Sequence, residues 1–338
     1  MFTDDDYLDR NILLMIKRIL LLTLVLVGFA GNEAHAQDPN FTQFYANPLY
    51  LNPAFAGTAR CPRICLNYRN QWPAIAGTFV TMSASYDQHI RALSGGIGVL
   101  VMQDRAGAGT LNTLNASFIY AYQLNVSRSF SLKFGIQATY AQRTLDWSKL
   151  NFGDQIDPRY GFVYESGETA PNGLRRSFAD FSAGFMGYGE HFYFGAAVNH
   201  LTQPNQSFWG DQGGQSALPM KITAHAGASI PLTRSRFQTP TIISPNILYQ
   251  RQQAFQQLNI GMYVSRGPIV GGLWYRNRDS FIVLLGIQQN AFRIGYSYDV
   301  TMSKLTNATA GSHEVSLSLV IPCKKPSRRF RTVDCPSF

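Results

Sequence analysis

Apolar and polar residues alternate along most of this chain with a period of two. In residues 131–140 the even positions are apolar and the odd ones are polar or glycine, and residues 291–299 and 313–320 show the same alternation. A period of two places successive side chains on opposite faces of a β-strand. Helical periodicity is almost absent, so the pattern predicts an all-β protein.

The alternating segments predict fourteen strands, which is an even number. We expect them at residues 63–72, 78–89, 94–104, 111–123, 130–142, 177–187, 191–200, 219–230, 241–251, 255–265, 269–276, 281–289, 291–299 and 313–320. An even number of antiparallel strands places both ends of a closed barrel on the same side of a membrane, as in bacterial outer-membrane proteins.

The lengths of the connections separate a membrane barrel from a soluble fold. The three longest, residues 143–176, 201–218 and 300–312, all follow odd-numbered strands, whereas the other side has mostly tight turns, with 231–240 as the exception. Outer-membrane barrels have short periplasmic turns and long outer loops. A soluble β-sandwich or propeller would explain the alternation but not this pattern, nor a charged fraction of only 14%. We therefore expect a transmembrane antiparallel β-barrel over residues 61–322.

The N-terminal 36 residues predict a cleaved secretory signal. Lys17 and Arg18 precede an apolar segment, residues 19–29, and Ala34-His35-Ala36 has the small-x-small form of a cleavage site. The apolar segment is too short to cross a bilayer as a helix. Met15 is a possible true start. Export combined with a barrel predicts the cell outer membrane, with both termini in the periplasm.

Residues 37–60, which follow the signal, are rich in aromatic side chains and contain two Asn-Pro pairs. Asparagine before proline favours a turn and interrupts strands and helices. We therefore expect this segment to start on the periplasmic side and to fold into the barrel lumen or across its periplasmic mouth, as a plug or docking element. Its candidate residues are Phe41, Phe44, Tyr45, Asn47, Pro48, Asn52, Pro53 and Phe55.

The four cysteines, Cys61, Cys65, Cys323 and Cys335, predict a disulfide, because the periplasm is oxidising. The first and last strands are neighbours in a closed barrel. Cys65–Cys323 and Cys323–Cys335 are the leading pairs, with free thiols or a zinc site as the less favoured alternatives. The tail, residues 323–338, is basic and is either solvated or a docking site for an acidic partner. Its cations are Lys324, Lys325, Arg328, Arg329 and Arg331.

Several short motifs, in this order and spacing, resemble the PorP/SprF family of the Bacteroidetes. They are residues 37–57, Tyr-Arg-Asn-Gln-Trp at 68–72, Ser-Tyr-Asp at 85–87, Gly-Gly-Ile-Gly at 95–98, Asp-Arg-Ala-Gly-Ala-Gly at 104–109, Asn-Phe-Gly-Asp-Gln-Ile at 151–156 and the C-terminal residues 333–338. The resemblance implies an outer-membrane barrel of the type IX secretion or gliding machinery. It also implies partners: a secreted adhesin or its C-terminal domain, or periplasmic ring lipoproteins and a peptidoglycan-binding protein.

The motifs also supply structural candidates: Arg69, Trp72, Asp87, Asp104, Gly107, Gly109 and Asp154. Asp104 has two interpretations. It either caps a glycine-rich turn, which turn chemistry favours, or pairs with an inward arginine such as Arg69.

The sequence contains no recognisable enzyme motif. The six histidines lack H-x-x-x-H spacing, and there is no nucleophile elbow or phosphate loop. Gly95, Gly96 and Gly98 lie in a predicted strand, where glycine favours a crowded or curved wall. We expect no enzyme activity, no cofactor, no metal and no nucleic-acid partner. The alternative to a secretion component is a diffusion channel or a transporter of hydrophobic substrates.

Overall fold

The structure is a computed structural model that describes residues 38–59, 61–75, 77–107, 109–127, 129–171, 173–209, 216–232, 239–277, 279–289, 291–302 and 310–323. The chain divides into two compact units, residues 1–38 and 39–338, and every described strand belongs to the second. No helix among the described residues has the length and apolar character to cross a membrane. The expected signal peptide and the cations of the basic tail lie outside the described residues.

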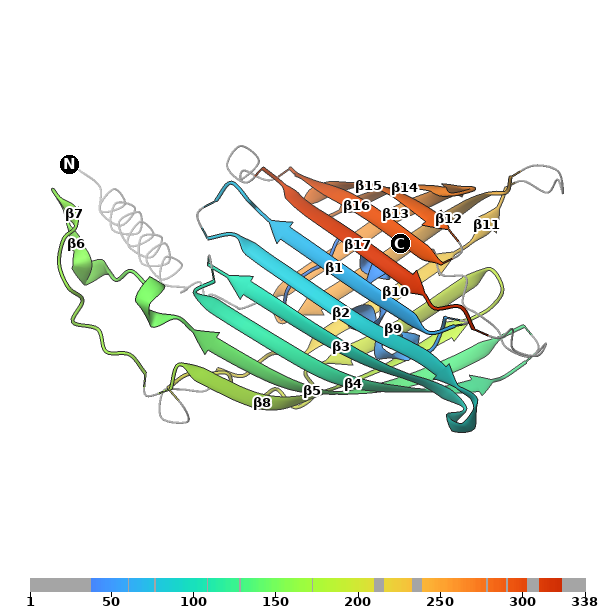
Figure 1. Ribbon diagram of the computed structural model, residues 1–338, viewed down its shortest axis with the longest axis horizontal. Coiled ribbons are helices and arrows are strands. Elements are labelled where there is room, and N and C mark those ends of the chain that lie inside the picture. The colour runs from blue at the N-terminus through green and yellow to red at the C-terminus, as the bar shows by residue number, and fades with distance from the viewer. Residues whose placement is uncertain are drawn as a thin grey trace, which may run out of the picture. The chain divides into compact units, whose positions relative to one another are not determined.

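Fourteen long strands form one antiparallel sheet (Figure 1). They are β1 (Arg63–Gln71), β2 (Phe79–Ile90), β3 (Gly95–Ala106), β4 (Leu111–Asn125), β5 (Ser131–Leu145), β8 (Arg175–Tyr188), β9 (Phe192–Asn199), β10 (Lys221–Ala228), β12 (Thr241–Gln252), β13 (Phe255–Arg266), β14 (Ile269–Arg276), β15 (Ser280–Gln289), β16 (Phe292–Thr301) and β17 (Ser312–Val320). Three two-residue strands complete the set: β11 (Ile230–Pro231), which pairs with β12, and β6 (Ile156–Asp157) and β7 (Gly161–Phe162), which pair with each other.

The sheet closes into a barrel. Each long strand pairs with its neighbours in sequence, and β1 pairs with β17, for example Tyr68 opposite Val315. The pairing of β10 with β12 completes the ring. The fourteen expected strands coincide with these fourteen, so the prediction of a closed antiparallel barrel is confirmed.

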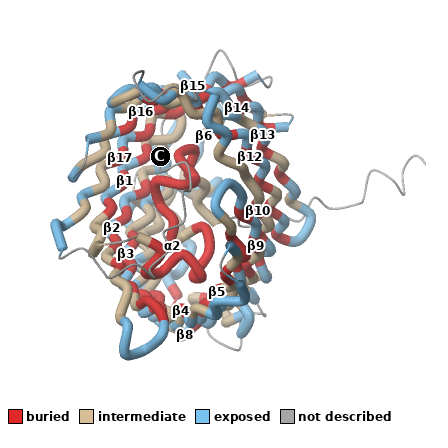
Figure 2. Tube along the Cα trace, turned by 90° about the vertical axis from the view of Figure 1, so that its right-hand side faces the viewer, coloured by how far each residue is buried: buried red, intermediate tan, exposed pale blue. Residues whose placement is uncertain are grey.

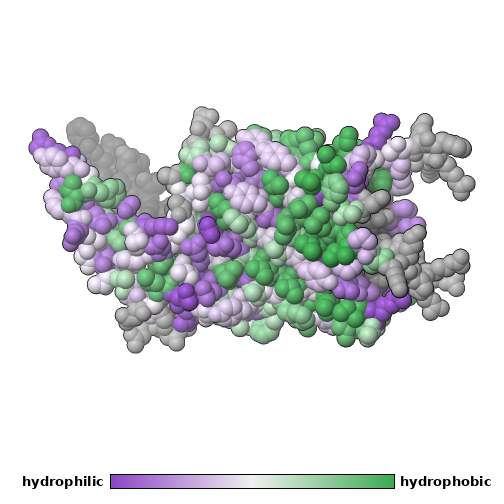
Figure 3. All heavy atoms as spheres, viewed as in Figure 1, coloured by the Kyte–Doolittle hydropathy of each residue, from purple (hydrophilic) through white to green (hydrophobic). Residues whose placement is uncertain are grey.

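The two faces of the wall differ as the alternation predicts. In β5, Phe134 and Ile136 are exposed, whereas Lys133 and Gly135, which alternate with them, are buried. Hydrophobic side chains cover much of the outer strand surface in Figure 3, and hydrophilic ones gather at the end near β6 and β7. Apolar groups outside and polar groups inside fit a wall that faces lipid.

Antiparallel connectivity gives the barrel two distinct ends. We call one the loop end, because it carries the connections 146–174 and 200–220, and the other the turn end, which carries short connections such as 189–191. The helices η4 (Trp147–Lys149) and η5 (Gly153–Gln155) belong to the loop end, and η3 (Arg91–Leu93) belongs to the turn end.

Candidate functional site

The lumen segment, defined here as residues 39–58, lies inside the barrel. Every residue from 41 to 58 except Tyr50 is buried. The segment contains three short helices: η1 (Phe44–Ala46), α2 (Pro48–Leu51) and η2 (Pro53–Phe55). Figure 2 shows this buried stretch surrounded by the strands of the wall.

The two Asn-Pro pairs shape the segment. Pro48 is the first residue of α2 and Pro53 is the first residue of η2, a position where the missing N–H of proline costs no helical hydrogen bond. The Asn52 side chain accepts a hydrogen bond from the N–H of Ala54 at 2.9 Å. Each pair therefore starts a helical turn. These turns make the chain compact enough for the eighteen buried or nearly buried residues 41–58 to fit inside the barrel.

Glu314 of β17 anchors the beginning of the segment. Its carboxylate accepts hydrogen bonds from Thr42 N at 2.6 Å, from Thr42 Oγ1 at 2.7 Å and from Gln43 N at 3.2 Å. The Gln43 side chain donates to the Glu314 carbonyl oxygen at 2.9 Å. The carboxylate thus satisfies two backbone donors that would otherwise be buried without a partner.

A buried charge network surrounds this anchor. Arg69 lies 3.4 Å from Glu314 and 3.0 Å from Asp299, and Arg276 lies 3.3 Å from the same Asp299 carboxylate. All four side chains are at most 5% exposed. Two cations and two anions balance, which is the condition under which buried charges are tolerated.

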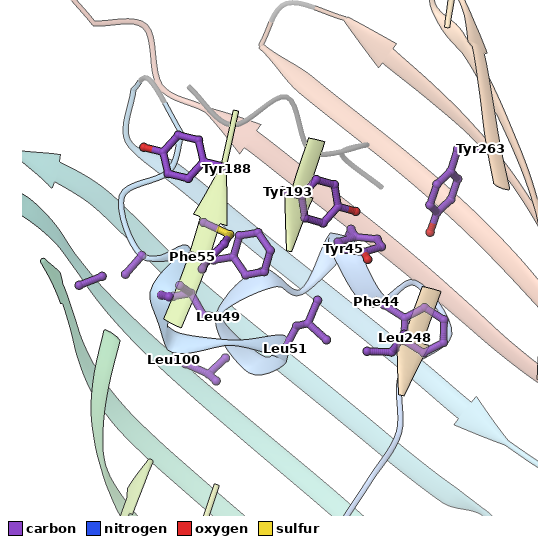
Figure 4. Packing of buried hydrophobic residues seen from close by; sticks show 14 of the residues in the cluster. Phe44, Tyr45, Leu49, Leu51, Phe55, Leu100, Tyr188, Tyr193, Leu248 and Tyr263 are labelled. Atoms are coloured by element: carbon purple, nitrogen blue, oxygen red, sulfur yellow. The ribbon is translucent and has the colours of Figure 1, made fainter. Parts of the chain in front are cut away.

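An aromatic cluster packs around η1. The Phe44 ring lies 5.0 Å from Trp274, and the Tyr45 ring lies 5.6 Å from Tyr193 and 6.5 Å from Tyr263. Figure 4 shows the segment's own residues Phe44, Tyr45, Leu49, Leu51 and Phe55 pointing toward side chains of the wall. Such edge-to-face contacts add about 0.5–1.5 kcal/mol per pair beyond burial.

The two asparagines tie the middle of the segment to the wall. Asn47 Nδ2 donates to Ser83 Oγ at 2.8 Å. Asn52 Nδ2 lies 3.0 Å from the carbonyl oxygen of Phe185 and 3.2 Å from that of Ala196. In both Asn-Pro pairs, the proline begins a helix and the asparagine side chain donates a hydrogen bond to a strand of the wall.

The end of the segment is held at the turn end of the barrel. Gly57 N donates to Asp87 Oδ2 at 2.9 Å, and Asp87 forms an ion pair with Arg63 at 2.8 Å. Lys133 Nζ donates to the Ala56 carbonyl oxygen at 2.5 Å. Because the contacts of Thr42 lie in the loop-end halves of β1 and β17, residues 42–57 run from the loop-end half toward the turn end. The anchor for its beginning is supplied by the first residues of β17, and the expectation that the segment starts on the periplasmic side stays a prediction.

Wall glycines make room for the segment. A Cβ at Gly135 would lie 2.4 Å from Ala54 N, one at Gly96 would lie 2.3 Å from the Ala56 carbonyl oxygen, and one at Gly184 would lie 2.2 Å from Asn52 Oδ1. Gly135 and Gly96 face backbone atoms of the segment and Gly184 faces the Asn52 side chain, so none of the three positions has space for a side chain. Of the three glycines that the sequence predicts in a crowded wall, Gly96 and Gly98 touch the segment, whereas Gly95 lies against Ala121 of β4.

Arg69 and Asp104 are on the same side of the wall but do not form the ion pair considered from the sequence. Thr81 lies between them in the strand register and donates to Asp104 Oδ1 at 2.6 Å. Arg69 forms its ion pairs with Asp299 and Glu314 instead. Closure of the barrel places β17 beside β1 and β16 beside β17, so Asp299 and Glu314, which are distant in sequence, form ion pairs with Arg69.

The remaining motif residues lie in loop-end connections. Trp72 has a φ of 59° and packs against Phe79 at 5.9 Å. Gly107 and Gly109 have positive φ values of 64° and 85° in the β3–β4 turn. Asp154 accepts hydrogen bonds from Ser166 Oγ and Gly167 N in the loop between β5 and β8. These residues shape loops and do not join the lumen site.

One disulfide joins the two ends of the barrel sequence. It links Cys61 to Cys323, with a Cα–Cα distance of 5.6 Å, so the expected Cys65–Cys323 pair was wrong. Position along the strand explains the difference: Cys65 is buried in β1 opposite Ser318, whereas Cys61 precedes β1 at the rim where β17 ends. Cys335 lies outside the described residues, but Cys323 is not available to it.

This pairing predicts a specific labelling pattern. Alkylation of the denatured, unreduced protein is expected to leave Cys61 and Cys323 unmodified and to label Cys65. Mass spectrometry of the peptides should recover a linked pair that contains Cys61 and Cys323. A linked peptide that contains Cys65 would contradict the register described above.

Glu314, Asp299, Arg276 and Lys133 were not singled out as site residues from the sequence. The alternation does place Glu314 and Asp299 on the polar faces of their strands, which is the signal that could have found them. In the part of the chain that the structure describes, no group of three or more His, Cys, Asp or Glu side chains could hold a metal ion.

Comparison with solved structures finds outer-membrane proteins at low similarity. The Ralstonia pickettii toluene transporter TbuX is 10% identical, with a TM-score of 0.44, and the match covers 81% of this chain and 93% of that one. The P. putida toluene transporter TodX gives 10% and 0.42 over the same shares, and a Pseudomonas aeruginosa FadL homologue gives 10% and 0.41 over 79% and 91%. No curated protein sequence matches the chain significantly.

The comparison with protein families is decisive. The family described as type IX secretion system membrane protein PorP/SprF matches residues 33–319, which include the lumen segment and the fourteen barrel strands except the last residue of β17. The barrel with an apolar outer wall places such a protein in the outer membrane. The resemblance noted in the short motifs is thereby confirmed, and the chain belongs to the PorP/SprF family of type IX secretion system membrane proteins.

Proposed function

We propose that this chain is a non-enzymatic docking component of the type IX secretion or gliding machinery. It would hold or help export a secreted surface protein, such as an adhesin through its C-terminal domain, or contact the periplasmic ring lipoproteins and a peptidoglycan-binding protein. One observation carries the proposal: the lumen segment occupies the barrel interior through hydrogen bonds, ion pairs and aromatic contacts. A filled barrel offers its two ends, and not its interior, to other molecules.

We place the turn end, with Cys323, in the periplasm and the loop end at the cell surface. Bacterial barrels have short periplasmic turns and longer outer loops, which supports this orientation. The C-terminal tail then enters the periplasm. The described start of the lumen segment lies in the loop-end half of the barrel. We therefore propose a periplasmic location for the tail and not for the start of the segment.

A diffusion channel is the second candidate, because the lumen wall is polar. Inward side chains such as Asn67, Gln250 and Gln257 have buried polar atoms without a hydrogen-bond partner among the described residues. Water or a solute could satisfy these groups if the lumen segment left the barrel.

Conductance separates the two candidates. The intact protein in a planar bilayer is expected to show no steady current, because the lumen segment fills the pore. A variant that lacks residues 38–56 should conduct, which shows that the barrel has inserted. A steady open-pore current from the intact protein would favour the channel.

Recovery of partners tests the docking role directly. A tagged full-length chain, isolated from cells after cross-linking, is expected to bring down a large surface adhesin or ring lipoproteins. The same purification with an unrelated barrel of the same membrane is the control. Absence of both classes of partner from the specific fraction would contradict the proposal.

A further inference from the structure

Strand β8 extends beyond its neighbour β9 at the loop end of the barrel (Figure 1). It pairs with β5 over its whole length, Arg175–Tyr188, but with β9 only over Ala183–Tyr188. Leu201, which follows β9, donates its N–H to the Phe181 carbonyl oxygen at 2.9 Å. From Arg175 to Asp180, this edge of β8 has no strand beside it among the described residues.

Alternation along β8 determines which backbone groups point toward this free edge. In an antiparallel sheet, alternate residues direct their N–H and C=O groups to opposite neighbours. The Phe181 carbonyl points to the β9 side, so the backbone groups two and four residues before it, at Ala179 and Ser177, point the same way. No backbone hydrogen bond reaches them within the part of the chain that is described. The pairing with β5 is continuous, so no bulge distorts the edge, and it can accept one more strand.

The free edge lies outside the apolar band of the barrel. Toward the loop end, the outward side chains of β8 change from Phe185 and Phe181 to Ser177 and Arg175. The Tyr140 hydroxyl donates to Ser177 Oγ at 3.0 Å, as expected of an aromatic side chain at a membrane interface. Lipid tails cannot form hydrogen bonds with free N–H and C=O groups, so they are not a suitable partner for this edge.

The inward face of the same segment favours an acidic side chain. Arg176 of β8 lies directly opposite Arg143 of β5 on that face, and like charges in this position destabilise a sheet. Arg143 donates to the Gln206 side chain, whereas the buried Nε of Arg176 has no hydrogen-bond partner among the described residues. A strand added to β8 places its own side chain opposite Arg176 in a pair without backbone hydrogen bonds, where side chains are closest. Aspartate or glutamate at that position neutralises one of the two cations.

We propose that the loop-end half of β8 is a site where an extended segment of an exported protein adds as a further strand, with an acidic side chain opposite Arg176. This inference rests on the proposed function and names the kind of segment that the loop end binds. Main-chain hydrogen bonds with Ser177 and Ala179 supply affinity, and the alternate side chains supply specificity.

A second copy of this chain fits the edge less well than a separate strand does. Copies in one membrane have the same orientation, so their β8 strands run in the same direction from the loop end to the turn end. Two identical edges in a symmetric dimer pair through antiparallel strands. The geometry of the membrane therefore opposes pairing of β8 with β8.

A proline at Ser177 tests the edge without removing a hydrogen bond of the barrel. Ser177→Pro deletes the N–H that points away from β5, and proline is tolerated on an edge strand at such a position. Ser177→Ala is the matched control, because it also loses the hydroxyl but keeps the N–H. The probe is a short fluorescent peptide of alternating threonine and glutamate, added to the full-length protein in phosphatidylcholine nanodiscs. Fluorescence anisotropy is expected to show about tenfold weaker binding to the proline variant than to the alanine variant.

A second pair of variants tests the acidic side chain. Arg176→Gln removes the cation beside the proposed strand, and Arg159→Gln removes one exposed cation elsewhere at the loop end. We expect Arg176→Gln to weaken binding of the glutamate peptide several-fold and Arg159→Gln to have little effect. Equal effects of the two variants would overturn the acidic partner, because binding would then follow net charge and not its location.

Three results would overturn strand addition itself. They are equal binding of the peptide to Ser177→Pro and Ser177→Ala, no binding to the native protein, and a dimer in detergent that Ser177→Ala keeps and Ser177→Pro loses. The last would identify a second copy as the occupant. Heat stability of the folded barrel on a gel identifies a proline variant that fails to fold. A peptide with methylated backbone amides then replaces that variant, and its binding to the native protein as tightly as the unmethylated peptide would refute the proposal.

Cells separate this inference from the proposed function. If deleting the whole chain stops surface display or gliding but the folded Ser177→Pro variant leaves both unchanged, the strand site is refuted and the proposed function stands. If deleting the chain changes neither, the proposed function fails, whatever the peptide does. Loss of display in Ser177→Pro, with display retained in Ser177→Ala, supports both.

Discussion

Replacement of Glu314 by alanine is expected to destabilise the protein by about 3–5 kcal/mol, the usual cost of removing one partner of a buried ion pair. The side chain is fully buried and neutralises Arg69. Its loss also leaves the N–H groups of Thr42 and Gln43 without an acceptor. Urea unfolding of the barrel in detergent micelles, followed by tryptophan fluorescence, measures the change.

Two further variants separate charge from hydrogen bonding. Glu314→Gln keeps an acceptor for the segment but not the charge, so it should fall between the native protein and Glu314→Ala. Adding Arg69→Met to Glu314→Ala removes the unpaired cation and is expected to restore part of the loss. If Glu314→Ala were as stable as the native barrel, Glu314 would not be the anchor of the lumen segment.

A single methyl group at Gly135 is expected to displace the lumen segment. The Cβ of Gly135→Ala would lie 2.4 Å from both Ala54 N and the Pro53 carbonyl carbon. Both are backbone atoms of η2, so they can move away only if η2 moves with them. Limited proteolysis should then cut within residues 41–57, which the native barrel protects. The barrel itself should remain folded, because strand residues such as alanine are tolerated in its wall.

Gly271→Ala is the matched control for this experiment. The added Cβ at Gly271 meets nothing within 4 Å, although Gly271 is also a strand residue of the same barrel. We expect it to leave both protection and stability unchanged. Equal protease sensitivity in the two variants would show that the segment is not held against β5.

The barrel could be predicted from the sequence because strand alternation is local information. The expected strand at residues 291–299, for example, corresponds to β16 at Phe292–Thr301. Side chains that face lipid must be apolar, whereas side chains that face the lumen can be polar. Each strand therefore carries the alternation in its own sequence. The connections then fix which strands share an end.

The partners within the lumen could not be predicted in the same way. Arg69 meets Glu314 across 245 residues of sequence, and that contact depends on the register between β1 and β17. The same register decides between the two cysteines: it places Cys65 opposite Ser318 and leaves Cys61, four residues earlier, beside Cys323. The register between strands this far apart in sequence is set when the ring closes, and it cannot be read from the sequence of one strand.

The anchor on β17 sets an order for the biogenesis of this protein. Thr42 and Glu314 are separated by 272 residues, so residues near the beginning of the lumen segment bind to the last strand that is made. The segment must already be in the interior when β17 meets β1, because a sealed ring leaves little room for three helical turns to enter. Completion of the ring and capture of the segment are therefore one late event, and a chain truncated before β17 can achieve neither.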